Sequence, residues 1–196
     1  MKIVEIKITN SDDCLRALQA TEKEGAESGL NQKSNLRLRL LAEELIGMVQ
    51  NLSGYIDALY WVDRQGSTFT LHLKAEVIMN KEVRELLLST ATSGKNSAAK
   101  GFMGKLREMI ASVMIPSAQG PSVLSGLSIG MMSAGSPVGE NAGMSSYIWS
   151  LNNYKEKIEE SEEAEDLERS IVASLADEVL VSIVGSKVQI DIIKAF

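Results

Sequence analysis

The sequence has a single cysteine and a single histidine in 196 residues, and each scarcity excludes a class of site. Cys14 alone can form neither an intrachain disulfide nor a cysteine-type zinc site. His72 is the sole histidine, which excludes a Ser–His or Cys–His nucleophile elsewhere in the chain. It alternates with Leu71 and Leu73, so we predict that it points outward from a strand.

Basic residues are also few, with 20 Lys and Arg against 26 Asp and Glu, a net charge of -6 and a pI near 5.0. A general nucleic-acid binder needs a basic face, so the composition argues against nucleic acid as a partner. Hydrophobic residues make up 44% of the chain. That is enough to bury the core of one domain, which we place at residues 1–196.

No apolar run is long enough to suggest a membrane span. Residues 109–139 carry no charge, but Ser, Gly, Gln and all three prolines interrupt any run of about 18 apolar residues. We therefore predict a Gly/Ser/Met-rich insertion over residues 112–153 that is a lid or a packed segment. The first seven residues alternate charge and lack the apolar part of a signal peptide, so we expect a cytoplasmic protein.

Residues 35–51 hold the clearest helical pattern. Leu38, Leu41 and Leu45 recur at three- and four-residue steps, which predicts a helix over residues 36–52 with one apolar stripe. Glu43, Gly47 and Asn51 follow at four-residue steps on one side of it. A carboxylate followed by a residue without a side chain leaves room for a ligand. The alternative is a solvated Glu and a Gly that packs against another helix.

Alternation of apolar and polar residues predicts five strands, at 2–9, 58–63, 68–76, 179–184 and 187–194. We expect one sheet, with the helix of residues 36–52 on one face. Asn10 begins another helix, and residues 25–33 read as a connection. Further helices are predicted at 80–88 and 106–113. Residues 155–169 are strongly acidic and predict a solvated helix or, alternatively, a docking face. The apolar residues Leu167, Ile171, Val172 and Leu175 predict a buried face in the second half of this helix.

A loop rich in Gly, Ser and Lys, residues 90–105, precedes the helix of residues 106–113. Backbone amides before a helix, with lysines nearby, suit an anion such as phosphate. It is not a Walker motif, because Ser89 occupies the position of the first glycine. A glycine-rich surface loop is the alternative. The candidate phosphate-binding residues are Ser93, Gly94, Lys95, Gly101, Gly104 and Lys105.

The order of these elements resembles the histidine-kinase-like (GHKL) ATPase superfamily. Glu43, and the end of the chain from Leu167 to Lys194, look like anti-sigma factor serine kinases. Residues 92–95 and 101–104 look like the lid of mismatch-repair and heat-shock chaperone ATPases. The resemblance implies a Bergerat-like α/β (α+β) two-layer sandwich, in which a mixed, mostly antiparallel sheet has helices on one face. It also implies a catalytic Glu43 and a nucleotide site that includes Gly47 and Asn51.

The sequence departs from the family at the residues that bind magnesium and recognise adenine. The magnesium-binding Asn is Gly47 here, and residues 74–80 lack the adenine-reading Asp-x-Gly-x-Gly motif, which leaves Glu76 as the only acidic candidate. We therefore expect a regulatory protein that binds ATP or ADP weakly, with the part of magnesium left open. A module of the same fold that binds a protein and no nucleotide is the alternative, and an active serine kinase comes third. A protein partner is expected, and a homodimer is left open.

Overall fold

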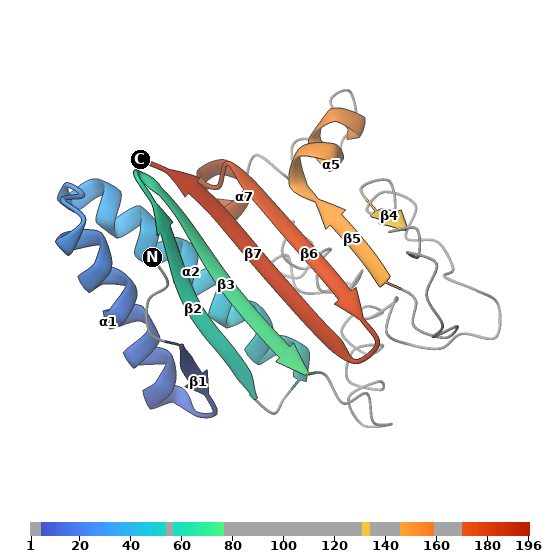
Figure 1. Cartoon of the computed structure of the whole chain (residues 1–196), viewed down its shortest axis with the longest axis horizontal. Helices are drawn as coiled ribbons and strands as arrows, with labels where there is room; N and C mark the ends of the chain where they lie inside the picture. The colour runs from blue at the N-terminus through green and yellow to red at the C-terminus, as the bar shows by residue number, and fades with distance from the viewer. Residues whose placement is uncertain (1–4, 54–56, 77–130, 134–145, 159–169) are drawn as a thin grey trace, which may run out of the picture.

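The computed structural model describes residues 5–53, 57–76, 131–133, 146–158 and 170–196. Seven strands form one sheet in the order β1-β2-β3-β7-β6-β5-β4, and every pair of neighbours is antiparallel (Figure 1). The strands are β1 (Ile6–Ile8), β2 (Ala58–Gln65), β3 (Thr68–Glu76), β4 (Met131–Ser133), β5 (Ser146–Ser150), β6 (Glu178–Val184) and β7 (Lys187–Ala195). The helices are α1 (Ser11–Glu27), α2 (Gln32–Ser53), α5 (Leu151–Ile158) and α7 (Ile171–Leu175).

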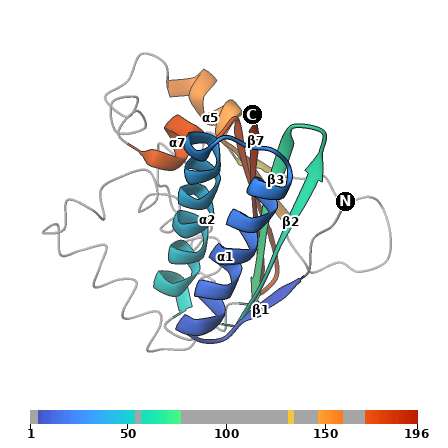
Figure 2. The same cartoon turned by 90° about the vertical axis from the view of Figure 1, so that its left-hand side faces the viewer.

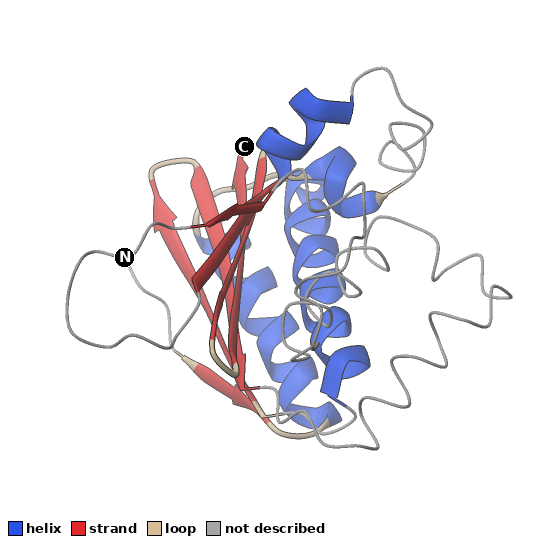
Figure 3. Cartoon of the chain, turned by 90° about the vertical axis from the view of Figure 1, so that its right-hand side faces the viewer, coloured by secondary structure: helices blue, strands red, loops and turns tan. Residues whose placement is uncertain are grey.

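The molecule has two layers, because α1 and α2 lie side by side on one face of the sheet (Figures 2 and 3). Leu38, Leu41 and Leu45 of α2 are fully buried against the sheet, as the apolar stripe predicted. The C-terminal hairpin joins β3 through β7 in the same sheet. The α+β two-layer sandwich expected from the sequence is confirmed.

Two glycines close the hairpins. Gly66 has φ 62° and Gly185 has φ 60°, a left-handed conformation that favours glycine. β2 pairs with β3 up to Gln65 and Thr68, so the turn consists of residues 66 and 67. The predicted strand of residues 58–63 is therefore two residues longer than the sequence suggested.

Asn10 caps α1, because its side chain accepts a hydrogen bond from the Asp13 backbone N–H at 3.0 Å. Asp13 in turn accepts from the backbone and hydroxyl of Thr9, and these bonds lower the pKa of the Asp13 carboxyl. The predicted connection of residues 25–33 is wrong in extent, since α1 continues to Glu27 and α2 begins at Gln32. Gly25 lies within α1, and its missing side chain leaves room for Asn35 of α2.

The two layers are also joined by polar contacts. The hydroxyls of Thr21 in α1 and Tyr60 in β2 lie 2.6 Å apart, and both residues are buried. Burial raises the pKa of Tyr60, so its hydroxyl keeps its proton. Arg64 of β2 donates to Glu24 of α1 at 3.1 Å. These contacts fix α1 on the sheet, and α1 in turn packs along α2.

Residues 146–153, which the sequence analysis assigned to the insertion, form β5 and the start of α5. Trp149, Leu151 and Tyr154 are buried in the core. Glu178 of β6 accepts hydrogen bonds from the Asn152 backbone N–H and the Ser150 hydroxyl, which holds the beginning of α5. This part of the predicted insertion is therefore integral to the sheet.

Ser170 caps α7, which begins at Ile171. Val172 is buried as predicted, but Ile171 is 45% exposed, so its predicted burial is wrong. Residues 159–169 and the predicted helices at 80–88 and 106–113 lie outside the described residues. Within the described ranges, no helix has the length and apolar character needed to cross a membrane.

Candidate functional site

The predicted ligand-binding side of α2 faces away from the sheet. Glu43 is exposed there, and Gly47 follows one helical turn later. A Cβ at Gly47 would have no atom of the described residues within 4 Å, so Gly47 is not a close helix-packing glycine in this part of the chain. Asn51 continues α2 one turn further.

Glu76 lies on the other face of the sheet. Its neighbours Leu73 and Ala75 are buried toward the helices, so the strand alternation turns Glu76 to the face that no described helix covers. We call this the open face. Glu76 accepts a hydrogen bond from the Ser186 hydroxyl at 3.0 Å. Because α2 covers the opposite face, Glu76 and Glu43 do not line one pocket.

The remaining candidate residues fall in the glycine-rich loop. These are Ser93, Gly94, Lys95, Gly101, Gly104 and Lys105, and they lie outside the described residues. The phosphate-binding role of this loop stays a prediction.

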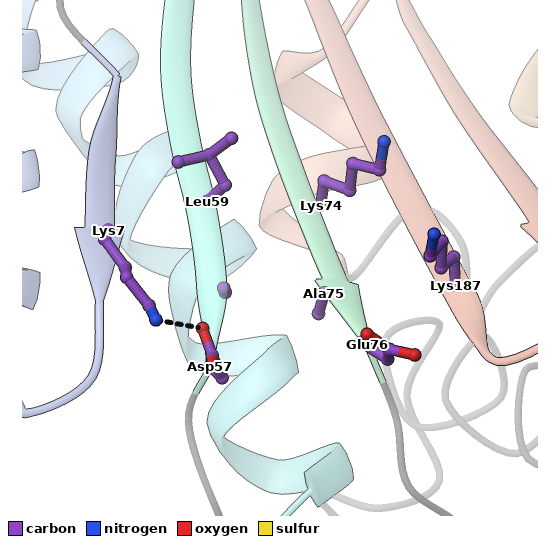
Figure 4. Close-up of a pocket in the computed structure, with 8 residues that line it drawn as sticks. Lys7, Asp57, Leu59, Lys74, Ala75, Glu76 and Lys187 are labelled. Carbon is purple, nitrogen blue, oxygen red and sulfur yellow. Dashed lines mark ion pairs between the residues drawn. The ribbon is translucent and has the colours of Figure 1, made fainter.

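A pocket opens on the same face as Glu76, at the end of β1, β2, β3 and β7 (Figure 4). Its volume is about 220 Å³. Leu59 supplies an apolar side chain among the charged ones on this face, whereas the side chains of Ala58 and Ala75 are buried toward the helices. The lining residues are Lys7, Asp57, Ala58, Leu59, Lys74, Ala75, Glu76 and Lys187. Sequence reasoning singled out only Glu76 of this set.

A hydrogen-bonded network surrounds His72 near the centre of the open face. Nδ1 of His72 lies 2.7 Å from Asp191 Oδ1, and Nε2 lies 3.3 Å from Asp63 Oδ2. The imidazole stacks on the Trp61 ring with centroids 4.7 Å apart and planes 9° apart. Gln189 donates to both oxygens of Asp191. The prediction that His72 points outward from the helix layer is confirmed, although its side chain is only 15% exposed.

The side chains around His72 mainly contact one another. Nδ1 of His72 is hydrogen-bonded to Asp191, and Nε2 lies 3.3 Å from Asp63 without making a hydrogen bond among the described residues. No group of His, Cys, Asp and Glu side chains in the described ranges is arranged to hold a metal ion. The sequence signal for the network was the polar phase of β2, β3 and β7, but only the register brings His72 opposite both Trp61 and Asp191.

Comparisons of the chain with protein-family models, with curated proteins and with solved structures find no match.

Proposed function

We propose that the chain is a cytoplasmic regulatory protein that binds ATP or ADP weakly, with a degenerate form of the histidine-kinase-like ATPase fold. The observation that carries the proposal is the side of α2 with Glu43 exposed and Gly47 one turn later. Apart from β4, β5 and α5, the described elements follow the order on which the resemblance rests: strand, helix, long helix, hairpin, and finally helix and hairpin.

The residues on this side of α2 favour nucleotide binding without hydrolysis. Glu43 could orient water, but Gly47 offers no side chain to hold a magnesium ion. Neutralisation of phosphate charge by metal is a main contribution to phosphoryl-transfer catalysis. Glu43 would repel phosphate, so the phosphate contacts would come from Lys95 and Lys105. Glu76 lies on the face of the sheet opposite α2, so it does not line a site beside Glu43. No residue is assigned to the adenine contact.

Equilibrium dialysis with labelled ATP tests this proposal. Replacing Lys95 and Lys105 by Ala should weaken binding, because each ammonium supplies a charge-assisted contact worth about 1.5–3 kcal/mol. Lys23→Ala is the matched control, since Lys23 is an exposed lysine of α1 paired with Glu27. Equal affinity in the double variant and the wild type would remove the glycine-rich loop from the proposal.

A protein-interaction module is the second candidate, and the open face favours it. Ile148 of β5 is 43% exposed and Val184 of β6 is 40% exposed. Ser146 pairs with Val184 and Ile148 with Ser182, so the two apolar side chains are diagonal neighbours on this face. Exposed apolar neighbours on a sheet suit a protein partner, a second copy included.

Analytical ultracentrifugation tests the self-association form of this second candidate. A dimer that dissociates on Ile148→Asp would support it, with Leu15→Asp on α1 as the matched control, because Leu15 is also exposed but lies in the helix layer. A monomer at high micromolar concentration would exclude the homodimer.

A further inference from the structure

The pocket on the open face has an arrangement of charge that the function proposed above does not use. Lys7 of β1 pairs with Leu59 of β2, and Leu59 pairs with Lys74 of β3. Leu59 therefore lies between two lysines in one row across the sheet. In antiparallel neighbours, directly opposed side chains have Cβ atoms about 4.5–5.5 Å apart. The row is an apolar floor with an ammonium group on each side.

A third lysine borders the same floor. Lys74 pairs with Gln189 and Glu76 pairs with Lys187, so Lys74 and Lys187 are diagonal neighbours on β3 and β7. Diagonal positions are about 7–8 Å apart, within reach of lysine side chains. Lysine stems are flexible, and their ammonium groups can converge on one anion.

Among the described residues, neither carboxylate of the pocket forms an ion pair with Lys74 or Lys187. Asp57 pairs with Lys7 at 3.2 Å (Figure 4). Glu76 stands directly opposite Lys187, an arrangement that favours a cross-strand ion pair, yet its carboxylate accepts from Ser186. Within the described part of the chain, no ion pair joins a carboxylate to Lys74 or Lys187. The two lysines border the pocket beside Glu76, whose carboxylate is engaged by the Ser186 hydroxyl.

We propose that this pocket binds a small molecule that carries a phosphate group, with Lys74 and Lys187 as the ligands of the phosphate. An oxyanion there would relieve the repulsion between the two ammonium groups and accept hydrogen bonds from both. Lys7, held by Asp57, adds positive potential at the rim, and Leu59 packs against the carbon part of the ligand. The pocket lies on the face opposite α2, so Glu43 and Gly47 do not line it.

Calorimetric titration with inorganic phosphate and with phenyl phosphate tests the site. Phosphate should bind the wild type, more weakly as ionic strength rises, and phenyl phosphate should bind more tightly because of the apolar floor. Lys74→Gln with Lys187→Gln should weaken both by roughly tenfold or more. Lys74→Arg with Lys187→Arg, which keeps the charge, should retain most of the binding. Lys23→Gln, outside the pocket, should leave binding unchanged.

The outcomes are distinct. No binding of either anion at tens of millimolar, or equal binding in the Gln variant and the wild type, would overturn the proposal. Circular dichroism shows whether the Gln variant is folded, and retained binding in the Arg variant shows that charge is responsible. Nucleotide binding that survives in the Gln variant but is lost with Lys95→Ala and Lys105→Ala would separate this site from the proposed function.

Discussion

Gly25 allows α1 and α2 to pack together, and its replacement by Ala should destabilise the fold. A Cβ at Gly25 would lie 2.1 Å from Oδ1 and 2.9 Å from Cγ of Asn35, and 3.3 Å from Cδ2 of Leu38. Asn35 is held in place by a hydrogen bond from its Nδ2 to the Glu22 backbone carbonyl at 2.9 Å. The new methyl group must therefore displace the Asn35 amide or separate the helices.

The magnitude follows from three contributions. Gly to Ala in a helix interior gains about 1 kcal/mol from helix propensity. Overpacking costs about 1–3 kcal/mol, and loss of the Asn35 hydrogen bond costs about 1 kcal/mol. The sum is a net destabilisation of about 1–3 kcal/mol. In a domain of this size each kcal/mol lowers Tm by about 2–4 °C.

Urea unfolding followed by circular dichroism measures the effect. Gly47→Ala is the matched control in α2, and it should stabilise by about 1 kcal/mol because the added methyl group meets no described atom within 4 Å. Adding Asn35→Ala to Gly25→Ala should recover part of the loss, since the smaller side chain makes room. Stabilisation by Gly25→Ala equal to that at Gly47 would refute the packing argument.

Three further predictions concern polar contacts. Burial is the largest single influence on the pKa of Asp177 and raises it, but hydrogen bonds from Ala195 and Lys194, with the charges of Lys194 and Lys155, together outweigh it and lower the pKa. Its carboxylate therefore stabilises the fold above its unfolded pKa and loses this contribution as pH falls through the folded value. Because the Asp177 side chain is 47% exposed, solvent screens its interactions, and Asp177→Asn should cost less than about 1 kcal/mol at pH 7 and nothing at low pH, by urea unfolding at several pH values. His72→Gln should destabilise by about 1 kcal/mol, because it removes the ring that hydrogen-bonds Asp191 through Nδ1 and stacks on Trp61, as thermal unfolding would show. Asn10→Ala should cost about 1 kcal/mol through loss of the α1 cap, with faster amide exchange in the first turn.

The sequence predicted the sheet well for a physical reason. One face of β2, β3, β6 and β7 is covered by helices, so apolar residues alternate with polar ones along each strand. β5 was missed because its five residues, Ser146–Ser150, follow a stretch rich in Gly and Ser and alternate only weakly. The end of α1 was predicted too early, because a glycine such as Gly25 often marks the end of a helix. The place of Gly25 inside α1 is understood only from its close contact with Asn35 of α2.

The candidate site was predictable only in part. The helical phase correctly placed Glu43 and Gly47 on one side of α2. Glu76 was grouped with them, although its spacing from His72 already indicated the outward face. Lys74 and Lys187 are 113 positions apart in the chain, so only the strand register could bring them to one pocket.

Calorimetric titration of the full chain with ATP and ADP, with and without magnesium, tests the proposed function most directly. The account predicts weak heats of binding at millimolar nucleotide that magnesium changes little, because Gly47 offers no metal ligand, and no release of phosphate over hours. No binding of either nucleotide would contradict it and favour the protein-interaction module, and magnesium-dependent hydrolysis would show that the site is catalytically complete.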